Sequence, residues 1–361
     1  DQHGLYFRPG NSNQAVVVND GGVAYASSLS DADTNARFVT AESNFVTTQF
    51  YTVAQSPPST PRDIVIGGTQ DNGTYLFDSP GSILRAAIDT PPGGDGAHSF
   101  FDQVGGTYAI VNYTYNDAIT KLDFNAAGQY INNGGTDLSA SLAIPSEGSF
   151  INPAALDSNQ DAYFSNASRD TNNDGVDDVF AIRVITGLTG TPATSLITSG
   201  LSSTPSAFEV SPHTTGSTSL FVGTKDGNVL KITNANTTPS VTTLTKPGVG
   251  SISDIHFGDT EDKIYVTYFN YGNSIINIFY SIDGGTTWVQ KEGNDGSGDL
   301  PDLPVYCVLN NPYEADEVIV GTELGVWKTL NFTATHPNWS LAYQGMSDVA
   351  VFDMDFRGTS A

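Results

Sequence analysis

The chain has 361 residues and a formal net charge of −25, from 14 Lys and Arg against 39 Asp and Glu. Because so acidic a surface repels phosphate groups, it excludes nucleic acid and anionic membranes as partners. The single cysteine excludes a disulfide framework and a Cys-based zinc site, and no apolar run reaches the roughly 18 residues of a membrane helix, so we expect no membrane insertion.

One strand–turn–strand pattern recurs along the chain and predicts the fold. β-forming residues lead into a Gly, Asn or Asp turn and then into a second strand, in four clear and three looser copies at residues 16–25, 64–75, 108–111, 162–164, 221–230, 263–266 and 318–327. Units spaced by roughly 40–60 residues are typical of propeller blades, each a four-stranded sheet. We therefore predict an all-β protein, a single β-propeller over residues 1–361 with seven four-stranded blades, an eighth blade being the alternative.

Short apolar strands precede these units and are predicted to line a central channel as the innermost strands. Examples are residues 50–54, 100–101, 207–210 and 305–308. Residues 4–8 also resemble an innermost strand. Residues 349–356 either close the first blade as a clasp or open a further blade that is cut. Because Asp1 and not Met opens the chain, we expect a processed or excised piece of a larger multidomain protein.

Two further stretches are predicted to be structural. Residues 138–143 are the nearest approach to a helix, and this run is short and rich in Ser. Cys307 lies in the apolar run 303–309, which predicts a buried and inert thiol.

Residues 281–288 form a tight, Gly-supported turn with the sequence Ser-Ile-Asp-Gly-Gly-Thr-Thr-Trp. This octet resembles the Asp-box, or BNR repeat, of sialidase-like, sortilin-like and xyloglucanase-like propellers. The chain as a whole is similar to secreted BNR/sortilin-like propeller proteins of the Bacteroidetes type, a resemblance that also involves residues 19–25, 67–75 and 321–329. It implies a secreted, extracellular or cell-surface protein and gives Asp283 and Trp288 structural roles, away from the ligand face.

An acidic loop at residues 170–178 carries the clearest metal signal. Its oxygen-bearing side chains alternate and a glycine stands at the bend, as in the first part of an EF-type calcium loop. The predicted Ca²⁺ ligands are the side chains of Asp170, Asn172, Asp174 and Asp178 and the carbonyl of Val176. Since Ala181 stands where an EF-hand has Glu, the loop resembles those of dockerin, thrombospondin or FG-GAP repeats. It would stiffen the fold; the alternative is an acidic surface turn without metal.

The catalytic candidates are two aspartates in Gly-rich turns, Asp20 and Asp95. Xyloglucanase-like propellers carry catalytic Asp residues in such turns, and two carboxylates across a cleft can hydrolyse a glycosidic bond. Asp in a Gly-rich turn is also ordinary turn chemistry, so no catalytic residue is assigned. Two strongly raised carboxyl pKa values in one cleft would favour a glycoside hydrolase or lyase. Seven Arg and five scattered His give no support to a sialidase or a zinc hydrolase.

Aromatic residues in predicted loops are the candidates for ligand binding, since their rings can stack on sugars. They are Tyr113, Tyr115, Tyr268 and Tyr271, and the alternative is that each packs between blades. We therefore predict a non-catalytic recognition or adhesion module of the cell surface that binds polysaccharide or a surface protein and is stabilised by calcium. The alternatives are a glycoside hydrolase and a structural subunit of a cell-surface assembly.

Overall fold

The computed structural model shows an all-β protein. The residues it describes are 2–19, 22–30, 38–40, 48–78, 82–84, 94–131, 134–272, 275–293, 298–342, 345 and 349–357. Within them the strands form seven four-stranded antiparallel sheets, which confirms the predicted fold class. Helix is limited there to η1 (Thr114–Asn116) and α2 (Leu138–Leu142), and neither is long and apolar enough to span a membrane.

Each sheet is a meander of four strands that follow one another in the chain. The sheets consist of β1 (Gln2–Arg8), β2 (Asn11–Asn19), β3 (Gly22–Ala26) and β4 (Val39–Thr40); β5 (Phe50–Gln55), β6 (Ile64–Thr69), β7 (Gly73–Asp78) and β8 (Ser82–Leu84); β9 (Ser99–Phe101), β10 (Tyr108–Asn112), β11 (Ile119–Asp123) and β12 (Thr136–Asp137); β13 (Ala154–Asp157), β14 (Ala162–Asn166), β15 (Ile182–Thr186) and β16 (Ala193–Ile197); β17 (Pro205–Val210), β18 (Leu220–Thr224), β19 (Val229–Thr233) and β20 (Ser240–Thr243); β21 (Ile252–Phe257), β22 (Ile264–Tyr268), β23 (Ile278–Ser281) and β24 (Val289–Gln290); and β25 (Val305–Asn311), β26 (Glu314–Thr322), β27 (Gly325–Thr329) and β28 (Trp339–Leu341).

The repeat units of the sequence fall on the second strand of each sheet, and the four clear copies run on into the third strand. Their turns explain why the pattern is so regular. In the turn from β18 to β19, Gly227 has φ +87° and its N–H donates to the carbonyl of Thr224 at 2.9 Å. A glycine adopts this left-handed conformation without steric cost, so Gly or Asn is favoured in tight hairpin turns and recurs with them in the sequence.

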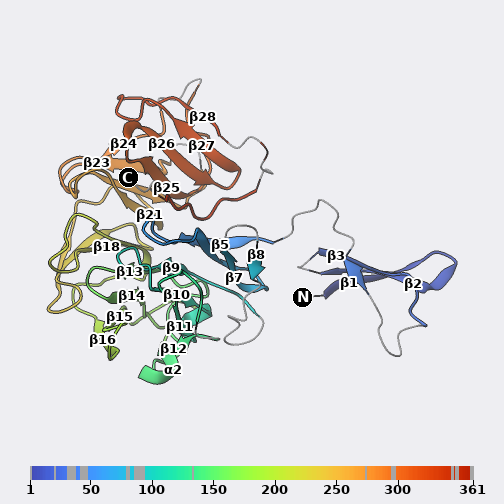
Figure 1. Ribbon diagram of the computed structural model, residues 1–361. Helices are drawn as coiled ribbons and strands as arrows, with labels where there is room; N and C mark the ends of the chain where they lie inside the picture. Colours follow the sequence, from blue (N-terminus) through green and yellow to red (C-terminus); the bar gives the residue numbers. More distant parts are fainter. Residues whose placement is uncertain are drawn as a thin grey trace.

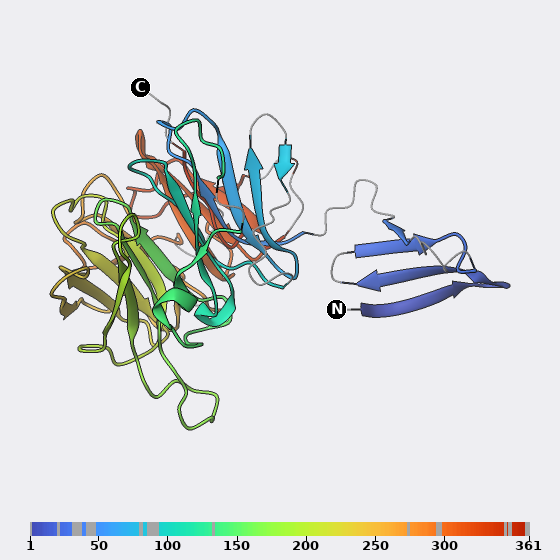
Figure 2. The ribbon, with the colours of Figure 1, turned by 60° about the horizontal axis from the view of Figure 1, so that its bottom comes forward.

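Six of the sheets, from β5 to β28, lie around a common centre, whereas the sheet β1–β4 lies apart from them (Figures 1 and 2). The predicted innermost strands at residues 50–54, 100–101, 207–210 and 305–308 are the first strands of their sheets, β5, β9, β17 and β25. Residues 4–8 belong to β1 and so lie in the separate sheet. That one propeller extends over residues 1–361 stays a prediction.

Apolar side chains fill the space between each of these six sheets and the next. Ile66 of β6 packs in one cluster with Val111 of β10, and Phe164 of β14 packs in another with Val222 of β18. Five such clusters of buried residues join the sheets in succession. Since burial stabilises by roughly 25 cal/mol per Å² of apolar surface, these interfaces are the main source of stability.

Residues 349–357 join the last sheet of the ring to the first. The N–H of Val351 donates to the carbonyl of Thr322 at 3.0 Å, next to β25 and β26. On the other side, Asp353 and Asp355 accept the N–H groups of Val53 and Gln55 in β5, at 2.8 and 2.7 Å. Within the described residues, no strand ladder pairs this segment with either sheet. It acts as a clasp that is held by backbone hydrogen bonds on the β26 side and by side-chain carboxylates on the β5 side.

The turn at residues 281–288 connects the two outer strands β23 and β24. Asp283 accepts the N–H of Thr287 at 2.8 Å, and the indole N–H of Trp288 donates to the carbonyl of Thr245 in the preceding sheet at 2.7 Å. Asp283 therefore satisfies a turn amide and Trp288 packs between sheets, as predicted for this turn.

A buried ion pair fixes the loop before β13. The Nε and Nη2 atoms of Arg183 lie 2.8 Å from the two carboxylate oxygens of Glu147, and the two side chains are 10% and 1% exposed. The N–H of Glu147 donates to the carbonyl of Tyr115, so the pair ties strand β15 to the loop before β13, which in turn is bonded to η1. Such a bidentate pair is strongly destabilising to break, because one charge stays buried without its partner.

We expect Glu147→Gln to lower the free energy of unfolding by about 3 kcal/mol, measured by urea denaturation. The matched control is Asp259→Asn, which removes a carboxylate from an exposed pair with Lys263 and should cost less than about 1 kcal/mol. Equal losses in the two variants would contradict the role of the buried pair.

Candidate binding site at the channel mouth

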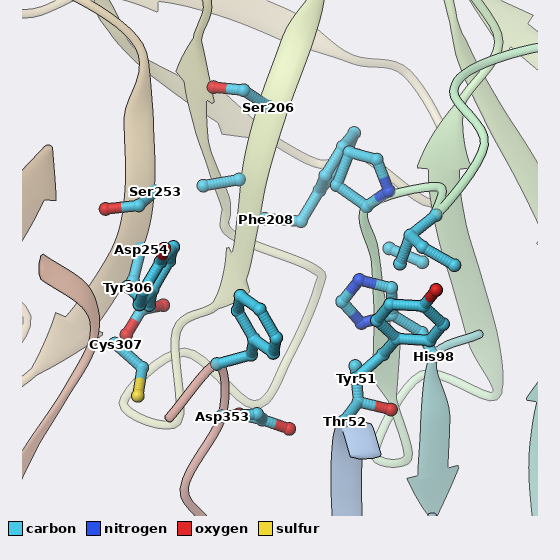
Figure 3. Close-up of a pocket in the computed structure, with 15 residues that line it drawn as sticks. Tyr51, Thr52, His98, Ser206, Phe208, Ser253, Asp254, Tyr306, Cys307 and Asp353 are labelled. Carbon is cyan, nitrogen blue, oxygen red and sulfur yellow. The ribbon is translucent and has the colours of Figure 1, made fainter. Parts of the chain in front are cut away.

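A cavity of about 390 Å³ lies where the innermost segments converge. Its walls come from β5, β17, β21 and β25, from residues at the starts of β9 and β13, and from the segment 349–357. In Figure 3, Tyr51 and His98 lie across the cavity from Asp254 and Tyr306. Of the predicted innermost strands, those at residues 50–54, 207–210 and 305–308 line this cavity, whereas residues 100–101 and 4–8 do not.

A row of five aromatic rings leads from the surface into this cavity. Tyr271 and Phe269, which are 57% and 44% exposed, stand at its outer end with ring centroids 6.2 Å apart. Phe269 lies 5.3 Å from Tyr306, Tyr306 lies 4.8 Å from Phe352, and Phe352 lies 6.5 Å from Tyr51. The last three rings line the cavity, so the row is continuous from the rim to its interior.

The loop after β22 positions the outer end of the row. Asn270, between the two exposed rings, donates its amide N–H to the carbonyl of Val249 at 2.8 Å. The neighbouring Gly250 has φ +98°, and a Cβ at this position would lie 2.0 Å from the side-chain oxygen of Asn270. Only glycine allows this close approach, which fixes the loop and with it the two rings.

Two partly buried aspartates from the innermost segments also line the cavity. Asp254 accepts the N–H of Val308 at 2.9 Å and Asp353 accepts the N–H of Val53 at 2.8 Å. Burial raises the pKa of Asp254 to about 8 and the pKa of Asp353 to about 6, although these hydrogen bonds oppose the shift. Both carboxyl groups therefore retain a proton at pH values where most aspartates are ionised.

The other titratable groups around the cavity are uncharged at neutral pH. Burial lowers the pKa of His98 to about 4, and burial with the charge of Asp95 raises the pKa of Tyr51 to about 12. Burial also raises the pKa of Tyr306 to about 12 and that of the Cys307 thiol well above its usual range. Cys307 is a buried, free cysteine, as predicted.

The predicted catalytic residues have different outcomes. Asp95 lies beside the inner end of the row, where it accepts the hydroxyl of Tyr51 at 3.3 Å and the N–H of Asp71 at 3.2 Å. The hydroxyl of Tyr113 lies against Gly94, the neighbour of Asp95. Asp20 lies outside the described residues. The structure thus brings Asp95 and Tyr113 to one side of the mouth, with Asp95 orienting an aromatic ring.

The remaining predicted ligand-binding tyrosines differ in exposure. Tyr115 is 41% exposed and packs edge-on against Phe150, which directly precedes the cavity-lining Ile151. Tyr271 heads the aromatic row. Tyr268 is a correction: it is fully buried, because its hydroxyl bonds across to the neighbouring sheet and its ring packs in the core between β18 and β22. It has no ring face left for a ligand.

The predicted calcium loop, residues 170–178, connects β14 to β15 and caps its own amides. Asp170 accepts the N–H of Gly175 at 2.7 Å, and Asn172 accepts the N–H of Asp174 at 2.9 Å. A glycine with φ +90° stands at the bend. Two of the predicted ligands thus accept amides of their own loop, and calcium binding at this loop stays a prediction.

Asp178 fits the predicted ligand set less well. Its carboxylate accepts the N–H of Thr171 at 3.0 Å and its hydroxyl at 2.8 Å, and these bonds lower its pKa. Among the described residues, no three His, Cys, Asp or Glu side chains come together in a metal-ligand group. A calcium site here would combine the carboxylates of Asp170 and Asp174 with an amide and the carbonyl of Val176.

Comparison with known proteins supports the fold. No model of a protein family matches the chain, and no curated protein matches it. Among solved structures the chain is similar to YCF48 from Cyanidioschyzon merolae, with a TM-score of 0.50 and 16% sequence identity over 88% of this chain and 92% of that chain. YCF48 is a β-propeller, and a likeness at this identity shows the fold alone.

Asp254 should make stability depend on pH. In the unfolded chain it ionises near pH 4, whereas in the folded protein its pKa is about 8. Between these values the folded state holds a proton that the unfolded state has lost, so the contribution of Asp254 to stability falls as pH rises. We expect the free energy of unfolding of Asp254→Asn, measured with urea, to rise relative to that of the wild type by roughly 1–3 kcal/mol as the pH goes from 5 to 8.

The control for this measurement is Asp259→Asn, since Lys263 lowers the pKa of Asp259 and the group is ionised in both states over this range. Its free-energy difference from wild type should not change with pH. A constant difference for Asp254→Asn as well would show that Asp254 is ionised throughout.

Proposed function

We propose that this chain is a non-catalytic recognition propeller that binds a glycan at the channel mouth. The observation that carries this proposal is the aromatic row from Tyr271 to Tyr51, which passes from exposed rings into the cavity. Ligand sites are concave, mainly apolar and aromatic, and carry a few placed polar groups. Here Asp95 and Asp353 supply such groups beside the rings.

The extended form of the row favours a chain-like ligand. Its aromatic rings are spaced by 4.8–6.5 Å and belong to four segments of the chain, namely the loop after β22, strand β25, residues 349–357 and strand β5. Aromatic rings offer a large apolar face at little cost in side-chain entropy, so successive rings can hold successive sugar units. The Asp-box resemblance of residues 281–288 further supports a secreted or cell-surface location and a role in adhesion.

A glycoside hydrolase is the second candidate, because the cavity contains two carboxyl groups with raised pKa values, Asp254 and Asp353. General acids in glycosidases have raised pKa values of this kind. Both groups, however, hold the N–H of a neighbouring innermost strand, which gives them a structural task. Recognition therefore remains the first choice.

Tyr306→Ala should lower glycan affinity at least tenfold, about 1.4 kcal/mol, because it removes the ring at the centre of the row. The measurement is retention in affinity gels that contain a panel of polysaccharides. The matched control is Tyr6→Ala, since Tyr6 is 65% exposed in the separate sheet. Equal retention of Tyr306→Ala and wild type would contradict the proposed site.

Release of reducing ends is scored in the same samples. Retention without release supports recognition. Release that Asp254→Asn abolishes, while Asp259→Asn leaves it intact, would replace recognition with hydrolysis. If the samples show neither retention nor release, the glycan is removed from the proposal and a protein partner is favoured.

We further propose that the loop at residues 170–178 binds Ca²⁺ as a stabilising ion. Asp170→Asn should lower calcium affinity at least tenfold, because it removes a charge from the oxygen set. Isothermal titration calorimetry and the calcium-dependent rise in melting temperature measure the effect. Asp161→Asn, in another turn of the same sheet, is the control. No calcium uptake by the wild type would overturn this part of the proposal.

A further inference from the structure

We propose that the glycan recognised at this mouth is a polycation, an amino-sugar polymer whose amino groups are protonated. This inference rests on the proposed function and adds the charge of the ligand. Three observations carry it: the lining of the cavity, the orientation of its carboxylates and the aromatic rings beside them.

The cavity lining contains hydrogen-bond acceptors and acids but, among the described residues, neither Lys nor Arg. Its carboxyl groups are those of Asp254 and Asp353, and burial lowers the pKa of His98 to about 4, so this imidazole adds no positive charge at physiological pH. An anionic sugar would therefore be desolvated here without a cationic partner, which is strongly unfavourable. The net charge of −25 also repels anions and attracts cations at long range.

Backbone amides hold the carboxylate of Asp353 in place. One of its oxygens accepts the N–H of Val53 at 2.8 Å, and the other accepts the N–H of Met354 at 2.9 Å. Each oxygen of a carboxylate can accept two hydrogen bonds, so one acceptor position remains at each. An ammonium group, which has three donors and no acceptor, matches these positions, whereas a carboxylate ligand has no donor to offer.

Aromatic rings line the same cavity as this carboxylate. Phe352 precedes Asp353 in the chain, and its ring packs edge-on against Tyr306 at 4.8 Å. An ammonium group beside such rings gains roughly 0.5–2 kcal/mol from the ring faces. Acidic groups also stand at both ends of the row, where Glu323 bonds the hydroxyl of Tyr271 and Asp95 bonds that of Tyr51. A polymer with a charge on each unit would meet carboxyl groups at both ends of the row and in the cavity.

The test compares three tetrasaccharides on the wild-type chain by isothermal titration calorimetry at pH 6.5. The probes are β-1,4-linked tetramers of glucosamine and of N-acetylglucosamine, which differ by the charged amine, and a galacturonic acid tetramer. We expect the glucosamine tetramer to bind at least tenfold more tightly than its acetylated counterpart, and the galacturonate tetramer not to bind. Added salt should weaken the first interaction most.

Two variants locate the preference. Asp353→Asn keeps an acceptor for the amide of Val53, and it should reduce the preference for the glucosamine tetramer over the acetylated tetramer to less than threefold. Asp259→Asn, an exposed carboxylate on another surface, should leave the preference unchanged. Loss of binding to both tetramers in Tyr306→Ala would place them on the aromatic row.

The outcomes separate this inference from the proposed function. Equal affinity of the wild type for the glucosamine tetramer and the N-acetylglucosamine tetramer would overturn the inference and leave glycan recognition in place. Tighter binding of the galacturonate tetramer would overturn it in the same way. If none of the three binds, both the inference and glycan recognition at this mouth are wrong.

Discussion

The structure depends on how the innermost strands satisfy their free edges. An innermost strand pairs with one neighbour in its own sheet, so its other edge leaves backbone N–H groups that must find acceptors. Carboxylates from the adjacent innermost segment provide them: Asp254 accepts from Val308, and Asp353 accepts from Val53. Because the second of these bonds links residues 300 positions apart, it joins the end of the described ring to its beginning.

The chemistry of the mouth is a consequence of this way of closing the ring. Carboxylates that reach across to the next strand necessarily come near the axis, where the segments converge around the cavity. Burial there raises the pKa of Asp254 and Asp353, and no Lys or Arg lines the described part of the cavity. The groups that join the last sheets to the first thus also give the cavity its acidic character, and raised carboxyl pKa values need no catalytic explanation here.

Much of the fold could be predicted because its signals are local. A tight hairpin requires residues that tolerate positive φ, so the turn residues identify each second strand in the sequence. The regular spacing of the units then predicts the apolar strand before it. The site could be predicted only in fragments, Asp95 and Tyr271 among them, because its parts meet only through closure. Asp353 accepts a hydrogen bond from a strand 300 residues away, and Tyr268 is buried because it packs against the neighbouring sheet.

The difference between motif and site has a physical reason. Residues 281–288 and 170–178 are visible as motifs because each turn satisfies its own amides with its own side chains, which constrains a short, contiguous sequence. The mouth has no such constraint: each segment contributes one to three residues, and these can vary as long as the strand stays paired. In a propeller of this kind, the turn sequences therefore indicate the fold, whereas the residues near the axis line the cavity and carry no local motif. The aromatic row and Asp353, more than the turn motifs, are where the function of this chain is to be sought.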